Sequence, residues 1–154
     1  MSVHMVDVSG KPDSQREAVA TGFIKLKKST IELIRSGKIE KGNVLDVSSV
    51  SAILGVKKTT ELLPLTHNIP ISNVKVDFNI EEEGIRVYVT VKTTAKTGVE
   101  MEALMGATAA LLNIWDMVKK YEKDEKGQYP ETVITDVRVL SKVKTPPRVM
   151  CDEG

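Results

Sequence analysis

Asp116 and Lys119 are the two residues of this 154-residue chain whose types and spacing point most directly to chemistry. They lie in the segment NIWDMVKK (113–120), which ends a helix-forming run of mostly small and apolar residues. A carboxyl group and an amine that are partly desolvated have shifted pKa values, and such groups can exchange protons with a substrate near neutral pH. The alternative is a surface ion pair between helical positions i and i+3, which contributes roughly a few tenths of a kcal/mol.

An apolar stripe of the same helical run carries these charges. Successive residues of a helix are rotated by about 100° around its axis. On this basis Lys119 lies on the same side of the helix as three apolar residues, and Asp116 lies about 20° further round the axis. The apolar residues of this stripe are Met101, Met105 and Leu112. Glu102 lies near the other end of the stripe, and the small residues beside it allow another element to approach closely. Because of this stripe, two interpretations of Asp116 and Lys119 remain: a catalytic acid–base pair and a simple surface ion pair.

A second candidate is the loop ELLPLTHNIPIS (61–72). Pro64 and Pro70 fix the backbone of this irregular apolar segment, and His67, one of two histidines, lies between them. A histidine on a stiff loop suits ligand binding or proton transfer. The alternative is a structural histidine whose ring is hydrogen-bonded to the backbone.

Basic residues at element ends and in loops form a third, diffuse candidate site for a polyanion, although ordinary solvated side chains explain most of them equally well. They are Arg16, Lys41, Lys57, Lys58, Lys96, Lys119, Lys142 and Lys144. The chain has neither a Walker motif nor the pattern G-x-G-x-x-G. The histidines and carboxylates have no metal-ligand spacing, so the sequence predicts no dedicated metal site.

Length and composition indicate one soluble domain. Hydrophobic residues make up 41% and charged residues 28%, the net charge is +1, and aromatic residues, at 4%, are too few for the stacking platforms of a nucleic-acid-binding protein. No apolar run approaches the ~20 residues of a membrane span. The single cysteine excludes a disulfide framework, and residues 1–17 lack the apolar core of a signal peptide. We expect a cytoplasmic protein that binds neither nucleic acid nor membrane, with a polar arm (1–17), a single catalytic domain (18–145) and a polar tail (146–154).

Hydrophobic periodicity predicts the elements that position these residues. Apolar residues at every second position predict a strand over 18–26. Ser29 and Glu32 have the spacing of a capping box and Gly37 supplies a stop, which predicts a short helix over 30–36.

The middle of the chain predicts a second helix and a hairpin. Asn43 caps the helix, which ends before Pro64. The apolar residues that recur along this helix are Val44, Val47, Val50 and Leu54. The segments NVKVDFNI (73–80) and IRVYVTVKTT (85–94) alternate apolar and polar residues around the short connector EEEG, which predicts an antiparallel hairpin with one face on the core.

A long helix (98–121), a surface loop (123–131) and a last strand (132–140) complete the predicted order β-α-α-β-β-α-β. Four strands with a long helix fit an α+β, ferredoxin-like sandwich, in which helices cover one face of an antiparallel four-stranded sheet.

Several segments occur in an order that belongs to a known family. They are HMVDVSGKPDSQREA (4–18), KGNV (41–44), ELLPLTHNIPIS, KTGVEMEAL (96–104) and IWDMVKK. Together they resemble the successive motifs of the cyclic pyranopterin monophosphate synthase family, the molybdenum cofactor biosynthesis protein C (MoaC) family. The resemblance runs from about residue 4 to residue 142, and KTGVEMEAL is a highly specific string.

The resemblance implies a lyase that converts (8S)-3',8-cyclo-7,8-dihydroguanosine 5'-triphosphate to cyclic pyranopterin monophosphate and diphosphate. It implies a homo-hexamer, a trimer of dimers, with active sites at subunit interfaces. Asp116 and Lys119 match the catalytic residues of the family. The substrate-binding residues that it implies are Leu65, Thr66, His67, Met101, Glu102, Arg16, Lys41, Lys57 and Lys142. No redox cofactor is implied, and Mg²⁺ could accompany the triphosphate.

Three departures from the family pattern bear on these expectations. Thr66 stands where many members have cysteine, so a thiol is not essential here. Asn68 replaces a common proline, and the usual Gly-rich basic tail after Lys142 is absent. Two other functions stay open: a non-enzymatic module that binds a small regulatory ligand, and an RNA-binding module, for which Tyr88 is the one well-placed aromatic residue.

Overall fold

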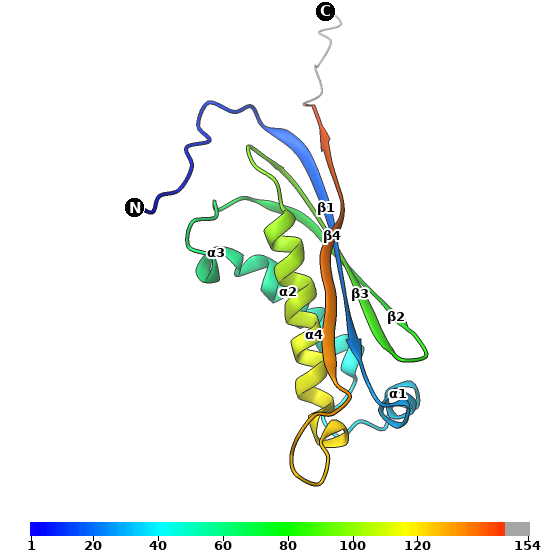
Figure 1. The fold of residues 1–154 in the computed structure, drawn as a ribbon. Coiled ribbons are helices and arrows are strands. Elements are labelled where there is room, and N and C mark those ends of the chain that lie inside the picture. The colour runs from blue at the N-terminus through cyan, green and yellow to red at the C-terminus, as the bar shows by residue number, and fades with distance from the viewer. Residues whose placement is uncertain (147–154) are drawn as a thin grey trace, which may run out of the picture.

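The structure, a computed structural model that describes residues 1–146, has two layers, with a sheet on one side and helices on the other (Figure 1). Its elements are β1 (Ser14–Lys25), α1 (Lys28–Arg35), α2 (Val44–Lys57), α3 (Thr59–Leu62), β2 (Ile71–Ile80), β3 (Gly84–Ala95), α4 (Glu100–Glu122) and β4 (Val133–Thr145). The four strands are antiparallel in the order β2-β3-β1-β4. This confirms the predicted α+β, ferredoxin-like sandwich, to which the structure adds the short helix α3.

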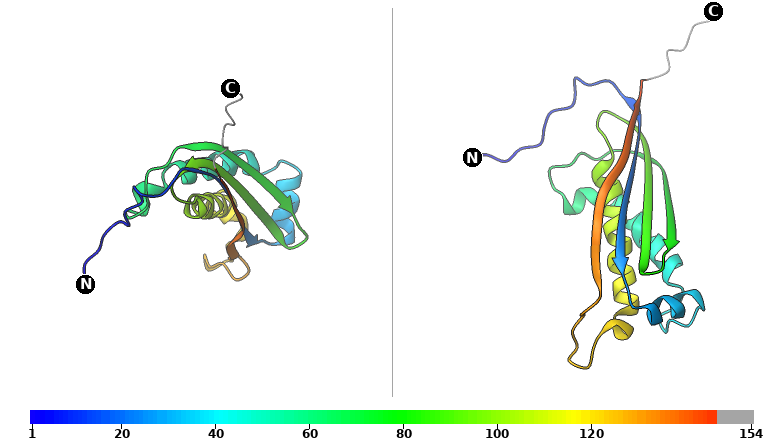
Figure 2. Two further views of the ribbon diagram at one scale, coloured as in Figure 1. Left: turned by 90° about the horizontal axis from the view of Figure 1, so that it is seen from above. Right: turned by 45° about the vertical axis from the view of Figure 1, so that its right-hand side comes forward.

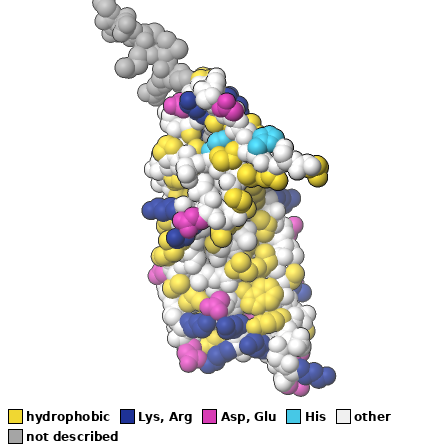
Figure 3. All heavy atoms as spheres, turned by 90° about the vertical axis from the view of Figure 1, so that its left-hand side faces the viewer, with side chains coloured by type: hydrophobic (Ala, Val, Ile, Leu, Met, Phe, Trp, Pro, Cys, Tyr) yellow, Lys and Arg dark blue, Asp and Glu magenta, His cyan; other side chains and the backbone are white. Residues whose placement is uncertain are grey.

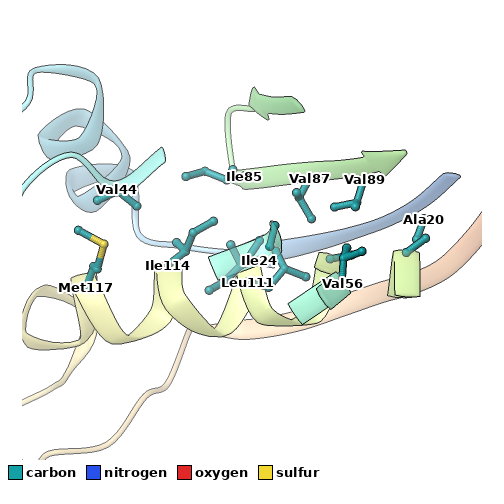
Figure 4. Packing of buried hydrophobic residues seen from close by; sticks show 14 of the residues in the cluster. Ala20, Ile24, Val44, Val56, Ile85, Val87, Val89, Leu111, Ile114 and Met117 are labelled. Carbon is teal, nitrogen blue, oxygen red and sulfur yellow. The ribbon is translucent and has the colours of Figure 1, made fainter. Parts of the chain in front are cut away.

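The core lies between α4 and the two central strands. Figure 2 shows the sheet curving over α4, and Figure 4 shows the aliphatic side chains that fill the space between them. Alternate residues of β3 are fully buried, as the period of the predicted hairpin requires, and these are Ile85, Val87, Val89 and Val91. Ala20 and Ile24 of β1 belong to the same core as Leu111 and Ile114 of α4, and Ile24 lies beside Leu111.

Small residues let α2 and α4 pack closely. A Cβ atom added to Gly55 would lie 2.8 Å from the carbonyl oxygen of Met105, and one added to Gly106 would lie 2.9 Å from Val56 Cγ2. Distances this short leave no room for a side chain, so the contact between the two helices requires glycine at both positions.

The buried face of α2 differs from the predicted one. Its core side consists of Val44, Ser48, Ala52, Gly55 and Val56. Of the predicted apolar residues only Val44 is buried, because the close approach of α4 selects the small side chains for the interior and leaves the larger ones outside. The exposed apolar residues on the solvent side of α2 and α4, here called the apolar face, are Val47, Val50, Leu54, Met101 and Leu112.

Two element boundaries also differ from the predicted ones. β1 begins at Ser14 rather than at residue 18, because pairing with both β3 and β4 continues through polar residues, so Arg16 belongs to a strand and not to the arm. β4 extends to Thr145 with register shifts along its pairing with β1. Gly37, with φ of +69°, follows α1 as predicted. Residues 147–154, most of the expected tail, lie outside the described residues.

Caps and loops follow the sequence only in part. Asn43 caps α2, since its Oδ1 accepts the backbone N–H of Asp46 at 3.0 Å. Ser29 is not a cap, because α1 already begins at Lys28 and no side chain of its N-cap residue caps it. The segment 123–131 is the predicted loop beyond α4 (Figure 1). Across residues 1–146, no helix combines the length and apolarity needed to cross a membrane.

The buried carboxylate of Glu122 connects three elements. It accepts the backbone N–H of Lys27, just before α1, at 3.2 and 3.3 Å, and the hydroxyl of Thr132, just before β4, at 2.7 Å. The hydroxyl of Thr30 in α1 donates a further hydrogen bond. Glu122 is 0% exposed, so these four hydrogen bonds replace water around its carboxylate.

We expect Glu122→Ala to lower the free energy of unfolding by about 3 kcal/mol or more. The substitution leaves buried hydroxyl and N–H groups without acceptors, each at a cost of roughly 1–3 kcal/mol. Chemical denaturation at one fixed protein concentration measures the change, because the stability of a protein that associates depends on its concentration. The control Glu32→Ala removes an exposed carboxylate of α1 and should stay within about 0.5 kcal/mol of the unaltered chain. Equal effects of both changes would contradict a stabilising role for Glu122.

Candidate functional site

The first group of candidate residues surrounds Asp116 in the last third of α4. The two carboxylate oxygens of Asp116 each accept a hydrogen bond at 3.0 Å. Oδ1 accepts from the Lys119 ammonium group, and Oδ2 accepts from that of Lys41. Lys41 also donates to the backbone carbonyl of Asp116 at 3.2 Å. Lys119 comes from the next helical turn, whereas Lys41 comes from the segment between α1 and α2. We call Lys41, Asp116 and Lys119 the Asp116 group.

The electrostatics of the Asp116 group differ from the expectation of a desolvated pair. The Asp116 side chain is 54% exposed, since the stripe that carries it faces solvent and not the core. The hydrogen bonds from Lys119 and Lys41 hold the pKa of the Asp116 carboxyl below its ordinary value. Asp116 is therefore an ionised carboxylate between two cations at neutral pH.

The second group lies at the other end of α4, around a hollow of about 270 Å³. The arm, the loop after α3 and the first turn of α4 enclose this hollow. Five of the predicted substrate-binding residues line it together: Leu65, Thr66, His67, Met101 and Glu102. We call these five residues the His67 group.

His67 and Thr66 use part of their hydrogen-bonding capacity within the chain. His67 Nε2 lies 2.7 Å from the carbonyl oxygen of Val6, and because a carbonyl only accepts, Nε2 carries the proton of this bond. The Thr66 hydroxyl donates to the carbonyl of Leu63 at 2.7 Å. The hydrogen bond from His67 thus holds the arm at Val6 beside the hollow.

Glu102 is the buried acid of the His67 group. It is 5% exposed, and its Oε2 atom has no hydrogen-bond partner within residues 1–146. Burial raises the pKa of Glu102, and the negative charge of Glu100 acts in the same direction. The two candidate carboxyl groups of α4 are therefore shifted in opposite directions, with Asp116 favoured as the anion and Glu102 closer to protonation at neutral pH.

Arg16 and Lys142 adjoin the His67 group in a second, smaller hollow of about 120 Å³, and Gly98 and Glu100 line both hollows. Arg16 donates to the backbone carbonyls of Ala95 and Lys96, at 3.2 Å each. Lys142 Nζ lies 3.0 Å from Glu100 Oε1. Burial by itself would raise the pKa of Glu100, but hydrogen bonds from its own backbone and from Lys142, with the charge of Arg16, hold that pKa below its ordinary value.

Lys57 joins neither group. It is exposed at the end of α2, and within the described part of the chain it makes no ion pair or side-chain hydrogen bond.

The Asp116 and His67 groups are too far apart to act on one small molecule within a single chain. Glu102 and Asp116 are separated by fourteen residues of continuous helix, which corresponds to about 21 Å at 1.5 Å per residue. Figure 3 shows a face of the molecule with histidine near its upper end, lysine and arginine gathered near its lower end, and apolar side chains between them. The chain thus carries two separate groups of candidate residues with exposed apolar surface between them.

Two charged residues that had not been predicted as site residues also line the larger hollow. Lys11 reaches it from the arm and lies within the motif HMVDVSGKPDSQREA (4–18), which was the available signal. Glu100 lies within KTGVEMEAL, beside two predicted residues. Its position as an acidic residue in the first turn of a helix was the signal from which it could have been predicted. Among residues 1–146, no three His, Cys, Asp or Glu side chains lie close enough to hold a metal ion.

Comparison with known proteins gives consistent matches. Residues 5–145 match the model of the MoaC family. A probable cyclic pyranopterin monophosphate synthase of Aeropyrum pernix is 58% identical over 140 residues, which cover 91% of this chain and 96% of that protein. A protein of the same name from Archaeoglobus fulgidus is 57% identical over 142 residues, or 92% and 91% of the two chains. A relative from Methanothermobacter thermautotrophicus, 53% identical over 92% of this chain and 89% of its own length, is named a probable cyclic pyranopterin monophosphate synthase accessory protein.

Proposed function

The chain belongs to the MoaC family, and from this premise we propose that it is a cyclic pyranopterin monophosphate synthase of molybdenum cofactor biosynthesis. Identity of 58% to a relative with that name, over 96% of the relative, is the observation that carries the proposal. The enzyme is a lyase that converts 3',8-cyclo-7,8-dihydro-GTP to cyclic pyranopterin monophosphate and diphosphate. A cytoplasmic location remains a prediction.

The products define what the site must do. A cyclic monophosphate and diphosphate arise when a hydroxyl oxygen of the substrate bonds to the α-phosphorus and the bond from that phosphorus to the diphosphate oxygen breaks. The hydroxyl loses its proton and the leaving diphosphate gains negative charge. Opening and reclosure of the purine-derived rings require further proton transfers. A base, a proton donor and several cations therefore have to meet at one substrate.

We assign the proton transfers to the Asp116 group. Asp116, held as a carboxylate by its two lysine partners, accepts a proton, and the ammonium of Lys119 beside it donates one. The charge of Lys41 is available to the departing phosphates. The His67 group, with Arg16, Lys142 and the more distant Lys57, binds the remainder of the substrate. Mg²⁺ could enter with the triphosphate, whose oxygens are the ligands it prefers.

A site shared between subunits follows from the separation of about 21 Å. In a two-fold contact, a surface of one subunit packs on the same surface of its partner. If two apolar faces pack with their α4 helices antiparallel, the Asp116 group of one subunit lies opposite the His67 group of the other. Exposed side chains such as Val50 (58%) and Leu112 (57%) supply the apolar area for this contact. We propose this dimer as the unit of a homo-hexamer, a trimer of dimers.

Lys41→Ala is expected to raise the Michaelis constant about 10- to 100-fold, the effect of losing one charge-assisted hydrogen bond. Its side chain is half exposed and, within residues 1–146, makes hydrogen bonds only to Asp116, so the melting temperature should change little. Arg16→Ala differs, because the guanidinium supports two backbone carbonyls, and we expect a lower melting temperature as well as weaker binding. A large loss of melting temperature in Lys41→Ala with unchanged affinity would show that Lys41 is structural.

Turnover by the purified chain alone tests the proposed function. The chain is incubated with enzymatically prepared 3',8-cyclo-7,8-dihydro-GTP, and cyclic pyranopterin monophosphate and diphosphate should form in equal amounts. The name of the Methanothermobacter thermautotrophicus relative raises an accessory role as the second candidate. An accessory protein would form no product by itself, so the absence of turnover by a chain that binds the substrate would favour that role.

A further inference from the structure

Lys41 reaches Asp116 from an exposed segment, residues 36–43, that connects α1 to α2. The segment contains a glycine, Gly42, with φ of +117°, and it has no regular secondary structure of its own. Three consecutive residues attach it to the rest of the chain. Ile39 is buried in the core, Glu40 contacts the end of α4, and Lys41 contacts Asp116.

The contacts of Glu40 come from two residues next to the Asp116 group. The backbone N–H of Glu40 donates to the hydroxyl oxygen of Tyr121 at 2.9 Å. The carboxylate of Glu40 pairs with the ammonium of Lys120. That ammonium also lies 5.5 Å from the centre of the Tyr121 ring. Within residues 1–146, neither the Tyr121 side chain nor the Lys120 side chain makes a hydrogen bond to the Asp116 carboxylate, whose side-chain partners are Lys41 and Lys119.

We propose that Tyr121 is a positioning residue for the Asp116 group, because its hydroxyl fixes the backbone one residue before Lys41 and thereby holds the Lys41 ammonium on the Asp116 carboxylate. The catalytic consequence rests on the proposed function, but the structural link does not. The backbone anchor is needed because an exposed ion pair gains too little by itself to hold a long lysine side chain in one geometry.

The pairing of Glu40 with Lys120 completes this arrangement. Three ammonium groups, those of Lys41, Lys119 and Lys120, lie around the end of α4 with the carboxylates of Glu40 and Asp116. The hydrogen bond and charge of Lys120 lower the pKa of Glu40, so Glu40 stays ionised and retains Lys120. Asp116 is left with Lys119 and Lys41 as its partners.

Titration of Asp116 in variants tests the proposal without any turnover. The side-chain carboxyl carbons of aspartate are labelled with ¹³C, and the Asp116 signal is assigned as the one missing in Asp116→Asn. Lys41→Met removes a cation that lowers the pKa of Asp116, so the titration midpoint of Asp116 should rise. We expect Tyr121→Phe to raise it in the same direction, and the double variant Tyr121→Phe/Lys41→Met to match Lys41→Met alone.

Two further measurements separate positioning from a general loss of structure. Amide hydrogen exchange at Glu40 should accelerate in Tyr121→Phe and remain slow in Tyr88→Phe, a matched change on β3. The control Tyr88→Phe should also leave the Asp116 midpoint unchanged. With substrate, kcat of Tyr121→Phe should fall by between about threefold and the hundredfold that a displacement of 1 Å can cost.

The outcomes distinguish this proposal from the proposed function. A rise of the midpoint in Lys41→Met without a rise in Tyr121→Phe would overturn the role of Tyr121. An unchanged midpoint in both variants would overturn it too, since the Lys41 ammonium would then not affect the titration of Asp116. If the titrations behave as expected but the unaltered chain forms no product, the proposed function fails and the positioning role of Tyr121 stands.

Discussion

Asp116→Asn is expected to lower kcat at least 100-fold while the chain stays folded and assembled. Asparagine keeps the size of the side chain, and its one amide oxygen can still accept a hydrogen bond from one of the two lysines, but it cannot exchange a proton at neutral pH. General acid–base catalysis contributes about 10²–10⁴-fold, which sets the expected loss. The side chain is half exposed and outside the core, so denaturation and the mass of the oligomer should change little.

The matched control is Asp77→Asn, which changes a half-exposed aspartate of β2 that pairs with Lys75. It should keep full activity. A rate above about a tenth of that of the unaltered chain in Asp116→Asn would rule out Asp116 as the essential base, and the two lysines would then act only as anion-binding groups.

Mixing two inactive variants is expected to restore activity to about a quarter of that of the unaltered protein. One variant carries Lys119→Ala, and the other carries a change in the group that we assign to the partner subunit. Arg16 is the first choice by its charge, but its hydrogen bonds to two carbonyls make His67→Ala the cleaner change. After random subunit exchange, half of the dimers are mixed, and each mixed dimer has one intact site and one site with both changes.

The control mixture combines Lys119→Ala with Asp116→Asn. Both changes lie in the same group, so every shared site contains at least one of them and no activity should return. Recovery in the first mixture alone would support a shared site. If mass spectrometry verifies subunit exchange and neither mixture recovers, each chain carries its own complete pocket and the antiparallel dimer is wrong.

Local signals predicted the fold well where the chain itself supplies the physical cause. The alternation in β3, the Asn43 cap and the left-handed Gly37 all depend on residues a few positions apart. The predicted end of a helix or strand was wrong where its position depends on residues elsewhere in the chain. Lys27, just before α1, is hydrogen-bonded to Glu122 at the far end of α4, and β1 extends back to Ser14 because two neighbouring strands pair with it.

The same division applies to the candidate site. The i,i+3 spacing places Lys119 beside Asp116, and the observed distance is 3.0 Å. The motif residues of the His67 group gather around one hollow. The sequence places Met101 and Glu102 at the opposite end of the long helix from Asp116, yet no pattern in it indicates that the loop with His67 packs at that end. The expected desolvation of Asp116 is not found within one chain, because periodicity identifies an apolar stripe but does not say which surface, if any, covers it.

The position of β1 inside the sheet has a consequence for how the protein is made. The N-terminal strand pairs with β3 on one side and with β4 on the other, and Gln15 is opposite Thr145. During synthesis β1 therefore has a free edge until the last strand leaves the ribosome. At about 5–20 residues per second, the fifty residues from the end of β3 to the end of β4 take roughly 3–10 s to add. For that time the edge of β1 is unpaired, and a chaperone that covers strand edges can bind it there, whereas in the finished sheet β4 occupies this edge and the open edges are those of β2 and β4.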